Sequence, residues 1–271
     1  MSRSVIDPKA AANRCFCGLH RLRQMNRNTE NRLTALTPAL VVFDLDGTLL
    51  DTHVDLVESL NHTIAALGLA PVSYDDLTHL VGHGAKVMIE RACKLQGHPL
   101  DPDELPALLE RFIAHYTETM PGQTVAYPGL IAAMDHLKDQ GYKLAVCTNK
   151  LEGLARTLLD RLQLTHYFDA ITGGDTFPVR KPDAAHLLGT VERAGGDPRR
   201  TVMIGDSAND ILVARNAAIP SIAVPFGYSD VPIETLEPTR IIQHFRELTS
   251  EMVETLISDF ADKADTRSAA R

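Results

Sequence analysis

Apolar and polar positions follow two different periods along this chain, and the change between them divides the sequence. From residue 127 onward, short apolar runs alternate with stretches of helical period. The pattern predicts strands at 143–147, 169–172, 201–204, 221–224 and 239–243, and helices at 128–140, 151–162, 183–194 and 208–217, followed by a final amphipathic helix. Repeated strand–helix units build a parallel sheet with right-handed crossovers. We therefore predict an α/β fold with a doubly wound, Rossmann-like parallel sheet.

A further strand precedes this region, and a helical stretch separates the two. Residues 41–43 form a continuous apolar run, which is typical of a strand covered on both faces. Helical spacing then covers Asp55 to Gly68 and Ala85 to Leu95, with shorter helices expected after Ser73 and after Asp101. Nothing in this stretch has the pattern of a strand. We predict that residues 53–125 form an all-helical cap domain inserted between two core segments, 38–52 and 126–262.

Charge is distributed unevenly along the 271 residues, whose formal net charge is −8. Residues 1–37 hold seven basic side chains against Asp7 and Glu30, so removing this +5 leaves −13 on the remainder. We expect residues 1–37 to be a disordered basic tail and residues 263–271 a frayed end. An acidic body argues against nonspecific binding to nucleic acid, because it releases no counterions from a phosphate backbone.

Hydropathy and cysteine usage indicate where the protein works. No window holds the roughly 18 consecutive apolar residues that a membrane helix requires. Cys15, Cys17, Cys93 and Cys147 form neither a disulfide framework nor a paired zinc motif, and Cys147 lies inside an apolar strand. We expect a soluble cytoplasmic protein with no membrane partner.

Two aspartates end the first apolar strand. The segment VVFDLDGTLL, residues 41–50, places Asp44 and Asp46 directly after the strand, spaced so that both point the same way. Ligands of open α/β sheets bind at the carboxyl ends of the strands. Two carboxylates this close resist ionising together unless a cation holds them, so the pattern predicts a metal ion or a retained proton. The alternative is a solvated turn in which an aspartate caps a helix.

Polar residues also lie at the ends of other predicted elements. Thr148 and Asn149 follow the strand at 143–147, Lys181 precedes a helix, and Asp206 and Asp210 follow the strand at 201–204. Because parallel strands end at one edge of the sheet, these residues are expected to form a single cluster with Asp44 and Asp46.

A phosphate ester would give each residue type in this cluster a task. Asp44 is the candidate nucleophile, which forms an aspartyl-phosphate. Asp46 is the candidate acid and base, which protonates the leaving alcohol and then deprotonates water. Magnesium suits an all-oxygen site, with Asp44, the backbone carbonyl of Asp46 and Asp206 as protein ligands.

The remaining candidates bind substrate or support its ligands. Thr48, Thr148 and Asn149 are expected to bind the substrate, and Lys181 to balance charge on the phosphoryl oxygens. Asp210 is expected either to hold a metal-bound water or to orient Lys181. Taken singly, Thr148 fits a strand-end hydroxyl, Lys181 a surface charge and Asp206 a helix cap. Their common position at one sheet edge favours function.

Four segments, FDLDGTLLDT, CTNK, RKPD and GDSAND, together resemble the sequence motifs of the haloacid dehalogenase superfamily in their usual order and spacing. The resemblance covers nearly all of residues 38–245. It implies a nucleophile at Asp44, an acid and base at Asp46, phosphate contacts from Thr148 and Lys181, and a magnesium ligand at Asp206. A helical insertion directly after the first motif is similar to the subfamily whose cap follows strand one.

Two further segments, VGHGAKVMIERA and GGDTFPVRKPDAAHLL, resemble the phosphoglycolate phosphatase family within this superfamily. That resemblance implies magnesium-dependent hydrolysis of 2-phosphoglycolate, so the expected partner is a small phosphorylated carboxylic acid. His83, Gly84 and Lys86 are candidates to contact its carboxylate. A glycine-rich connection carrying a solvated lysine is an equally good interpretation of these residues.

Other functions remain open at this point. A phosphatase or mutase of the same superfamily acting on a sugar phosphate or on pyrophosphate would share the whole core. A dehalogenase or a phosphonate-cleaving relative would lack an acid at Asp46, since neither reaction delivers a proton to an alkoxide. A noncatalytic phosphoreceiver would carry no cap of this size. The sequence leaves the oligomeric state undetermined.

Overall fold

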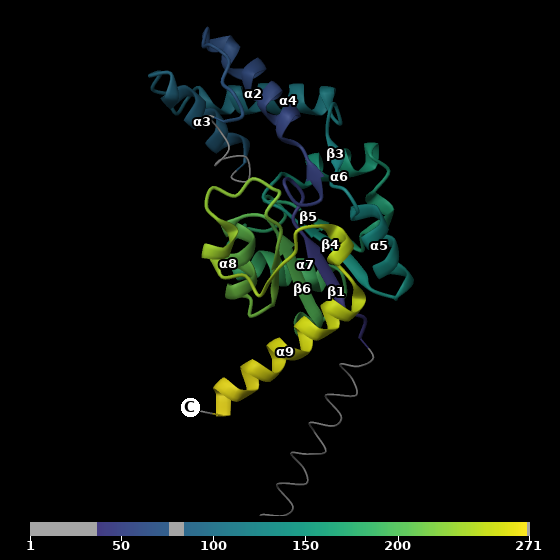
Figure 1. The fold of residues 1–271 in the computed structure, drawn as a ribbon. Coiled ribbons are helices and arrows are strands. Elements are labelled where there is room, and N and C mark those ends of the chain that lie inside the picture. Colours follow the sequence, from purple (N-terminus) through teal and green to yellow (C-terminus); the bar gives the residue numbers. More distant parts are fainter. Residues whose placement is uncertain (1–36, 76–83, 270–271) are drawn as a thin grey trace, which may run out of the picture. The chain divides into compact units, whose positions relative to one another are not determined.

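A six-stranded parallel sheet forms the centre of the computed structural model, which describes residues 37–75 and 84–269. Its order is β5-β4-β1-β6-β7-β8. Figure 1 labels β5, β4, β1 and β6 at the centre of the molecule. The strands are β1 (Leu40–Phe43), β4 (Lys143–Cys147), β5 (Ala170–Thr172), β6 (Thr201–Gly205), β7 (Ser221–Ala223) and β8 (Arg240–Ile241). Val42 of β1 lies opposite Ala145 of β4 and Met203 of β6. The predicted parallel α/β core is confirmed.

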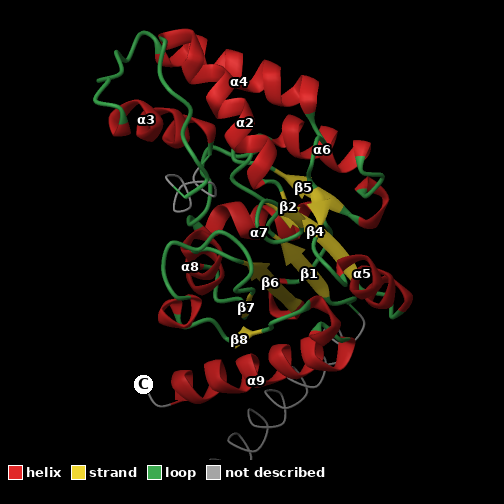
Figure 2. Cartoon of the chain, turned by 45° about the horizontal axis from the view of Figure 1, so that its top comes forward, coloured by secondary structure: helices red, strands yellow, loops and turns green. Residues whose placement is uncertain are grey.

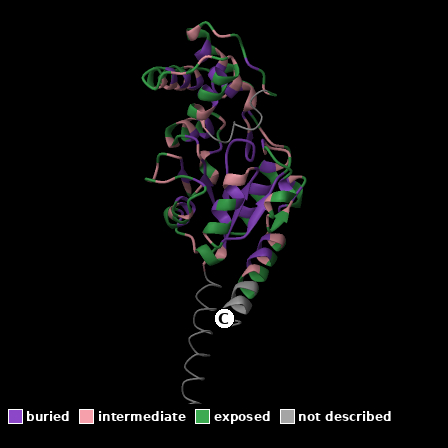
Figure 3. Cartoon of the chain, turned by 90° about the vertical axis from the view of Figure 1, so that its left-hand side faces the viewer, coloured by how far each residue is buried: buried purple, intermediate pink, exposed green. Residues whose placement is uncertain are grey.

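Helices cover both faces of this sheet (Figure 2). They are α5 (Leu130–Asp139), α6 (Glu152–Arg161), α7 (Ala184–Arg193), α8 (Ala208–Asn216) and α9 (Ser250–Ala269). Val41 and Phe43 of β1 belong to a buried cluster with side chains of α5, α6 and α9, whereas Leu40 and Val42 pack with α7 and α8. Because successive side chains of a strand face opposite ways, one apolar run supplies both layers of the core. Figure 3 shows these strands as buried.

A helical insertion lies between the first strand and the rest of the core. It contains α2 (His53–Ile64), the short 3₁₀ helix η1 (Ala65–Leu67), α3 (Ala85–Leu95) and α4 (Leu105–Thr119). Phe112 and Tyr116 of α4 are fully buried, as are Leu60 and Ile64 of α2. The insertion therefore has an apolar interior between its helices, as the helical spacing predicts.

The insertion begins and ends in a small antiparallel sheet that the sequence pattern did not predict. In it, β2 (Leu50–Asp51) pairs with β3 (Val125–Ala126). Each strand has two residues, which is too short for an alternating pattern to appear. Asp55 reinforces the junction, because its buried carboxylate accepts hydrogen bonds from the backbone of Gln123 (2.8 Å) and from both the backbone and hydroxyl of Thr124 (2.9 and 2.5 Å).

Some predicted element ends differ from the structure. Helix α4 begins at Leu105, whereas a cap at Asp101 predicts a start three residues earlier; Asp101 instead closes a turn with Glu104. Helix α9 continues to Ala269 and thus extends into the segment from residue 263 that we expected to be frayed. Extending a helix is much easier than nucleating one, and α9 is already anchored by buried side chains such as Val253.

Other predictions fall outside the described ranges. These are the basic tail at 1–36, with Cys15 and Cys17, and residues 76–83, which include most of the short helix expected after Ser73. Cys93 and Cys147 are buried free thiols. No helix within residues 37–75 and 84–269 is long and apolar enough to cross a membrane.

Candidate active site

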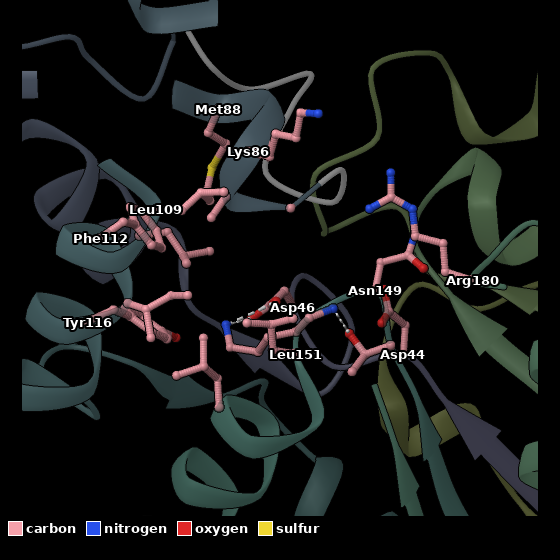
Figure 4. Close-up of a pocket in the computed structure, with 17 residues that line it drawn as sticks. Asp44, Asp46, Lys86, Met88, Leu109, Phe112, Tyr116, Asn149, Leu151 and Arg180 are labelled. Atoms are coloured by element: carbon pink, nitrogen blue, oxygen red, sulfur yellow. Dashed lines mark hydrogen bonds and ion pairs between the residues drawn. The ribbon is translucent and has the colours of Figure 1, made fainter. Parts of the chain in front are cut away.

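The carboxyl ends of three adjacent strands, β1, β4 and β6, bring the predicted polar residues together. Asp44 follows β1, and its backbone N–H continues the sheet by donating to the carbonyl of Ile204 (2.9 Å). Thr148 follows β4 and Asp206 follows β6, and all three side chains are buried. Figure 4 shows Asp44, Asp46 and Asn149 together in one pocket. The cluster therefore arises from sheet topology, as the sequence analysis expected.

Lys181 joins two of the aspartates. Its ammonium lies 2.9 Å from the Oδ1 atom of Asp44 and 2.6 Å from the Oδ1 atom of Asp210. Burial alone would lower the pKa of Lys181, but Asp210 and Asp44 hold it above the usual value, so the side chain stays charged. The other oxygen of Asp210 accepts from the backbone and hydroxyl of Ser207, which closes a capping box on α8. We expected Asp210 either to hold a metal-bound water or to orient Lys181, and its contact with the Lys181 ammonium fits the second role.

Asp206 is held from several sides. Its Oδ1 atom accepts a hydrogen bond from the hydroxyl of Thr48 (2.7 Å), and its Oδ2 atom accepts one from the backbone of Tyr228 (2.7 Å). The Thr48 side chain is fully buried and lies against Asp206, and it is absent from the wall of the cavity next to Asp44, whereas we predicted that it would contact substrate. Gly47 allows the Asp206 carboxylate and the Tyr228 ring to lie close to the backbone at residue 47, because a Cβ atom there would collide with both.

Asp46 faces a lysine that the sequence analysis did not single out. Its carboxylate oxygens lie 3.0 and 3.2 Å from the Nζ atom of Lys150, and one of them also accepts from the hydroxyl of Thr52 (2.8 Å). Burial alone would lower the pKa of Lys150, but Asp46 raises it above the usual value. The feature of the sequence that could have indicated Lys150 is its position two residues after Thr148, near the end of β4.

The charges of this cluster do not balance among the described residues. Asp44, Asp46, Asp206 and Asp210 are all buried, whereas Lys150 and Lys181 are the only buried ammonium groups that face them in the described part of the chain. Burial raises the pKa of Asp44 to about 7, with further repulsion from Asp210 and against the opposing effect of Lys181. Burial also raises the pKa of Asp206, and repulsion from Asp210 and Asp44 adds to this shift. When all six groups are ionised, two negative charges remain, which one divalent cation would neutralise.

The donor set also fits such a cation. Oxygen atoms of Asp44, Asp206 and Asp210 lie within 4.8 Å of one another, and hard cations such as Mg²⁺ prefer oxygen ligands. The Asp46 carboxylate is occupied by Lys150 and Thr52, which is consistent with the prediction that Asp46 would contribute its backbone carbonyl.

A cavity of about 230 Å³ adjoins Asp44 and Asp46. Its walls come from the core and from the insertion: Leu56, Gly84, Ala85, Lys86, Met88, Leu109, Phe112, Ile113, Tyr116, Thr148, Asn149, Lys150, Leu151, Leu154 and Arg180. Thr148 and Asn149 therefore lie where the sequence analysis expected them. Gly84 and Lys86 reach the cavity as well, but the Lys86 side chain is 61% exposed and lies 3.8 Å from Glu90. His83, the third predicted carboxylate contact, falls outside the described residues.

Comparison with known proteins agrees with this geometry. Residues 41–224 match the family described as haloacid dehalogenase-like hydrolase. The chain is 60% identical over 225 residues to a phosphoglycolate phosphatase of Agrobacterium fabrum, which covers 83% of this chain and 97% of that protein. It is 49% identical to a phosphoglycolate phosphatase of Mesorhizobium japonicum, over 80% of this chain and 96% of that protein. A crystal structure described as a predicted phosphoglycolate phosphatase from Haemophilus somnus superposes with a TM-score of 0.73 at 31% identity, covering 78% and 96% of the two chains.

Proposed function

Since the chain belongs to the haloacid dehalogenase-like hydrolase family and is a phosphoric monoester hydrolase, we propose that it cleaves 2-phosphoglycolate to glycolate and phosphate. The observation that carries the mechanism is the position of Asp44. It stands at the end of β1, lines the cavity, and is held by the buried ammonium of Lys181. The substrate is proposed from the names of the relatives.

Asp44 attacks the phosphorus. Its Oδ1 atom is engaged by Lys181 (2.9 Å) and by the backbone N–H of Leu45 (2.7 Å). No hydrogen bond between described residues uses the Oδ2 atom, so Oδ2 is the attacking oxygen. A bond forms between Oδ2 and phosphorus while the bond from phosphorus to the glycolate oxygen breaks, leaving an aspartyl-phosphate. Lys181 and Thr148 stabilise the charge on the phosphoryl oxygens.

Asp46 moves the protons. It gives a proton to the departing glycolate oxygen, and its carboxylate then accepts a proton from the water that attacks phosphorus. The bond from phosphorus to Asp44 breaks in this second step, so both aspartates return to their starting states. Thr52 and Lys150 hold the Asp46 carboxylate in place.

Magnesium is proposed as the cofactor, held by Asp44, Asp206 and the backbone carbonyl of Asp46. When bound, it would neutralise negative charge on the transferring phosphoryl group. Asp206 enters this role already oriented by Thr48 and the backbone of Tyr228.

We propose that residues 53–125 act as a cap over the site. Helix α4 contributes Phe112 and Tyr116 to the cavity wall, so apolar side chains of the insertion would keep water from the phosphoryl group during the first step. The two-stranded sheet of β2 and β3 joins this cap to the core. We also propose that the protein acts in the cytoplasm.

A substrate panel tests the proposal. With Mg²⁺ present, kcat/KM is measured for 2-phosphoglycolate, phosphoserine, several sugar phosphates and pyrophosphate. We expect 2-phosphoglycolate to be hydrolysed fastest. The substrate assignment fails if phosphoserine, pyrophosphate or a sugar phosphate is hydrolysed as fast, and the hydrolase mechanism fails if Asp44→Asn retains activity.

A further inference from the structure

Three cationic side chains line the described part of the cavity, and they differ sharply in burial. Lys86 and Arg180 are exposed, whereas the Lys150 side chain is only 5% exposed. Removing an ammonium group from water is costly unless an anion faces it. The Asp46 carboxylate is that anion for Lys150 in the structure. Because Lys150 also lines the cavity, a second anion that enters the cavity could bind it as well.

Tyr116 brings an unused hydrogen-bond donor to the same place. The Lys150 Nζ atom lies 4.4 Å from the centre of the Tyr116 ring, and Figure 4 shows Tyr116 extending from the insertion into the pocket. The Tyr116 residue is fully buried, and no acceptor in the described part of the chain takes a hydrogen bond from its hydroxyl. Burial raises the pKa of Tyr116 to about 12, so the hydroxyl stays protonated at neutral pH. A buried donor without a partner costs free energy that a ligand would recover.

We propose that the Lys150 ammonium and the Tyr116 hydroxyl form a subsite for the carboxylate of the substrate. This inference rests on the proposed function, because it takes the phosphorus to lie at Asp44 and the ester oxygen at Asp46. In 2-phosphoglycolate a single methylene group separates that ester oxygen from the carboxyl carbon. The carboxylate therefore falls beside Asp46, where Lys150 already stands.

The rest of the cavity wall favours a short acid over a polyol. Apolar side chains make up much of the cavity wall that the subsite shares: Leu56, Met88, Leu109, Phe112, Ile113, Leu151 and Leu154. Sugar hydroxyls placed against them would lose their hydrogen bonds to water without replacement. A carboxylate one methylene from the ester needs no more than the two donors of Lys150 and Tyr116. Selectivity for the acid thus arises from a residue of the core and a residue of the insertion acting together.

The test compares 2-phosphoglycolate with ethyl phosphate, which has a methyl group in place of the carboxylate. The ratio of their kcat/KM values measures recognition of the carboxylate, and a general loss of activity cancels from it. We expect Lys150→Met to lower the ratio roughly 100-fold and Tyr116→Phe roughly 10-fold, the range for hydrogen bonds to a charged group. Lys94→Met, an exposed lysine at the end of α3, serves as the matched control.

Each outcome separates this subsite from the proposed function. If the unmodified protein shows no preference for 2-phosphoglycolate, the substrate assignment fails and the subsite fails with it. If it shows the preference but Lys150→Met and Tyr116→Phe retain it, only the subsite is overturned. A ratio that collapses in Lys86→Met instead assigns the carboxylate to the cavity mouth. Circular dichroism establishes folding, and Tyr116→Phe, which keeps the buried ring, decides the matter if Lys150→Met is unfolded.

Discussion

The ammonium of Lys181 lies 2.6 Å from the Oδ1 atom of Asp210, in an ion pair in which neither side chain is more than 1% exposed. The same ammonium reaches Asp44, so Asp210 determines where the charge next to the nucleophile stands. A buried ammonium that loses one of two carboxylate partners is both less stable and less well oriented.

Asp210→Asn is therefore expected to lower kcat by roughly 10- to 100-fold, as for the loss of a group that positions a charge, with a smaller effect on KM. Steady-state kinetics on 2-phosphoglycolate provides the measurement. Asp183→Asn is the control, since Asp183 also caps a helix, α7, but is exposed and contacts no ammonium in the described structure. Equal losses in the two variants would contradict an orienting role for Asp210.

The metal-free protein is expected to lose stability as the pH rises. The pKa of Asp44 is raised in the folded state to about 7 from an ordinary value of 3.8, and that of Asp206 is raised as well. Both groups thus bind their protons more tightly in the folded than in the unfolded protein. The stability they contribute is complete below about pH 4 and is lost as the pH rises through 7.

Magnesium should reverse this loss, because it takes the place of the protons. We expect Mg²⁺ to raise the Tm by several degrees at pH 8 and by much less at pH 5, in scans of thermal unfolding with and without the metal. Asp206→Asn removes one ligand and should abolish the dependence of the Tm on Mg²⁺. An equal rise at both pH values would show that these carboxylates are not the site.

Gly47 and Gly141 offer a matched pair of substitutions. Both have φ of +81°, but a Cβ atom at Gly141 meets no other atom within 4 Å, whereas at Gly47 it would collide with Asp206 and Tyr228. Gly141→Ala should cost about 1 kcal/mol of backbone strain and leave kcat unchanged. Gly47→Ala should cost more and displace Asp206, so that activity falls at least 100-fold at moderate Mg²⁺. Full activity in Gly47→Ala would contradict the tight packing around Asp206.

Asp55 should matter for stability rather than for chemistry. Its three hydrogen bonds join the start of α2 to Gln123 and Thr124, next to β3. Asp55→Ala leaves these donors unpaired, including the two of the buried Thr124, so we expect the free energy of unfolding to fall by about 3 kcal/mol in urea denaturation. Glu58→Ala, on the exposed side of the same helix, should change it by less than about 0.5 kcal/mol.

Most of the strands of the sheet, and the residues that form the aspartate cluster, could be predicted from the sequence. Both depend on patterns within short segments of the chain. The strand at 143–147 and the helix at 85–95 have the predicted ends, because each is bounded by a clear change in apolar pattern. Asp44, Asp206 and Lys181 come together because parallel strands end at one edge, a property of topology that the strand–helix alternation already contains.

Contacts between distant segments could not be predicted in this way. Thr48 lies within the first motif and was expected to contact substrate, but its hydroxyl donates to Asp206, which only the folded chain brings near. Nothing in the sequence indicates that Lys150 and Tyr116 lie side by side, because Lys150 follows a core strand and Tyr116 lies within a helix of the insertion. Two-residue strands such as β2 and β3 leave no periodic pattern at all.

The account depends on a phosphoryl group passing through Asp44, and the most direct measurement is to locate it. Asp46→Asn removes both the acid that protonates the leaving alcohol and the base that activates water. The variant is therefore mixed with Mg²⁺ and p-nitrophenyl phosphate, whose phenolate leaves without a proton, so the intermediate should accumulate and be trapped by quenching in acid. Mass spectrometry of the digested protein is expected to place phosphate on Asp44 and to find none in the double variant with Asp44→Asn. Phosphate on another side chain, or turnover without any phosphorylated protein, would contradict the mechanism.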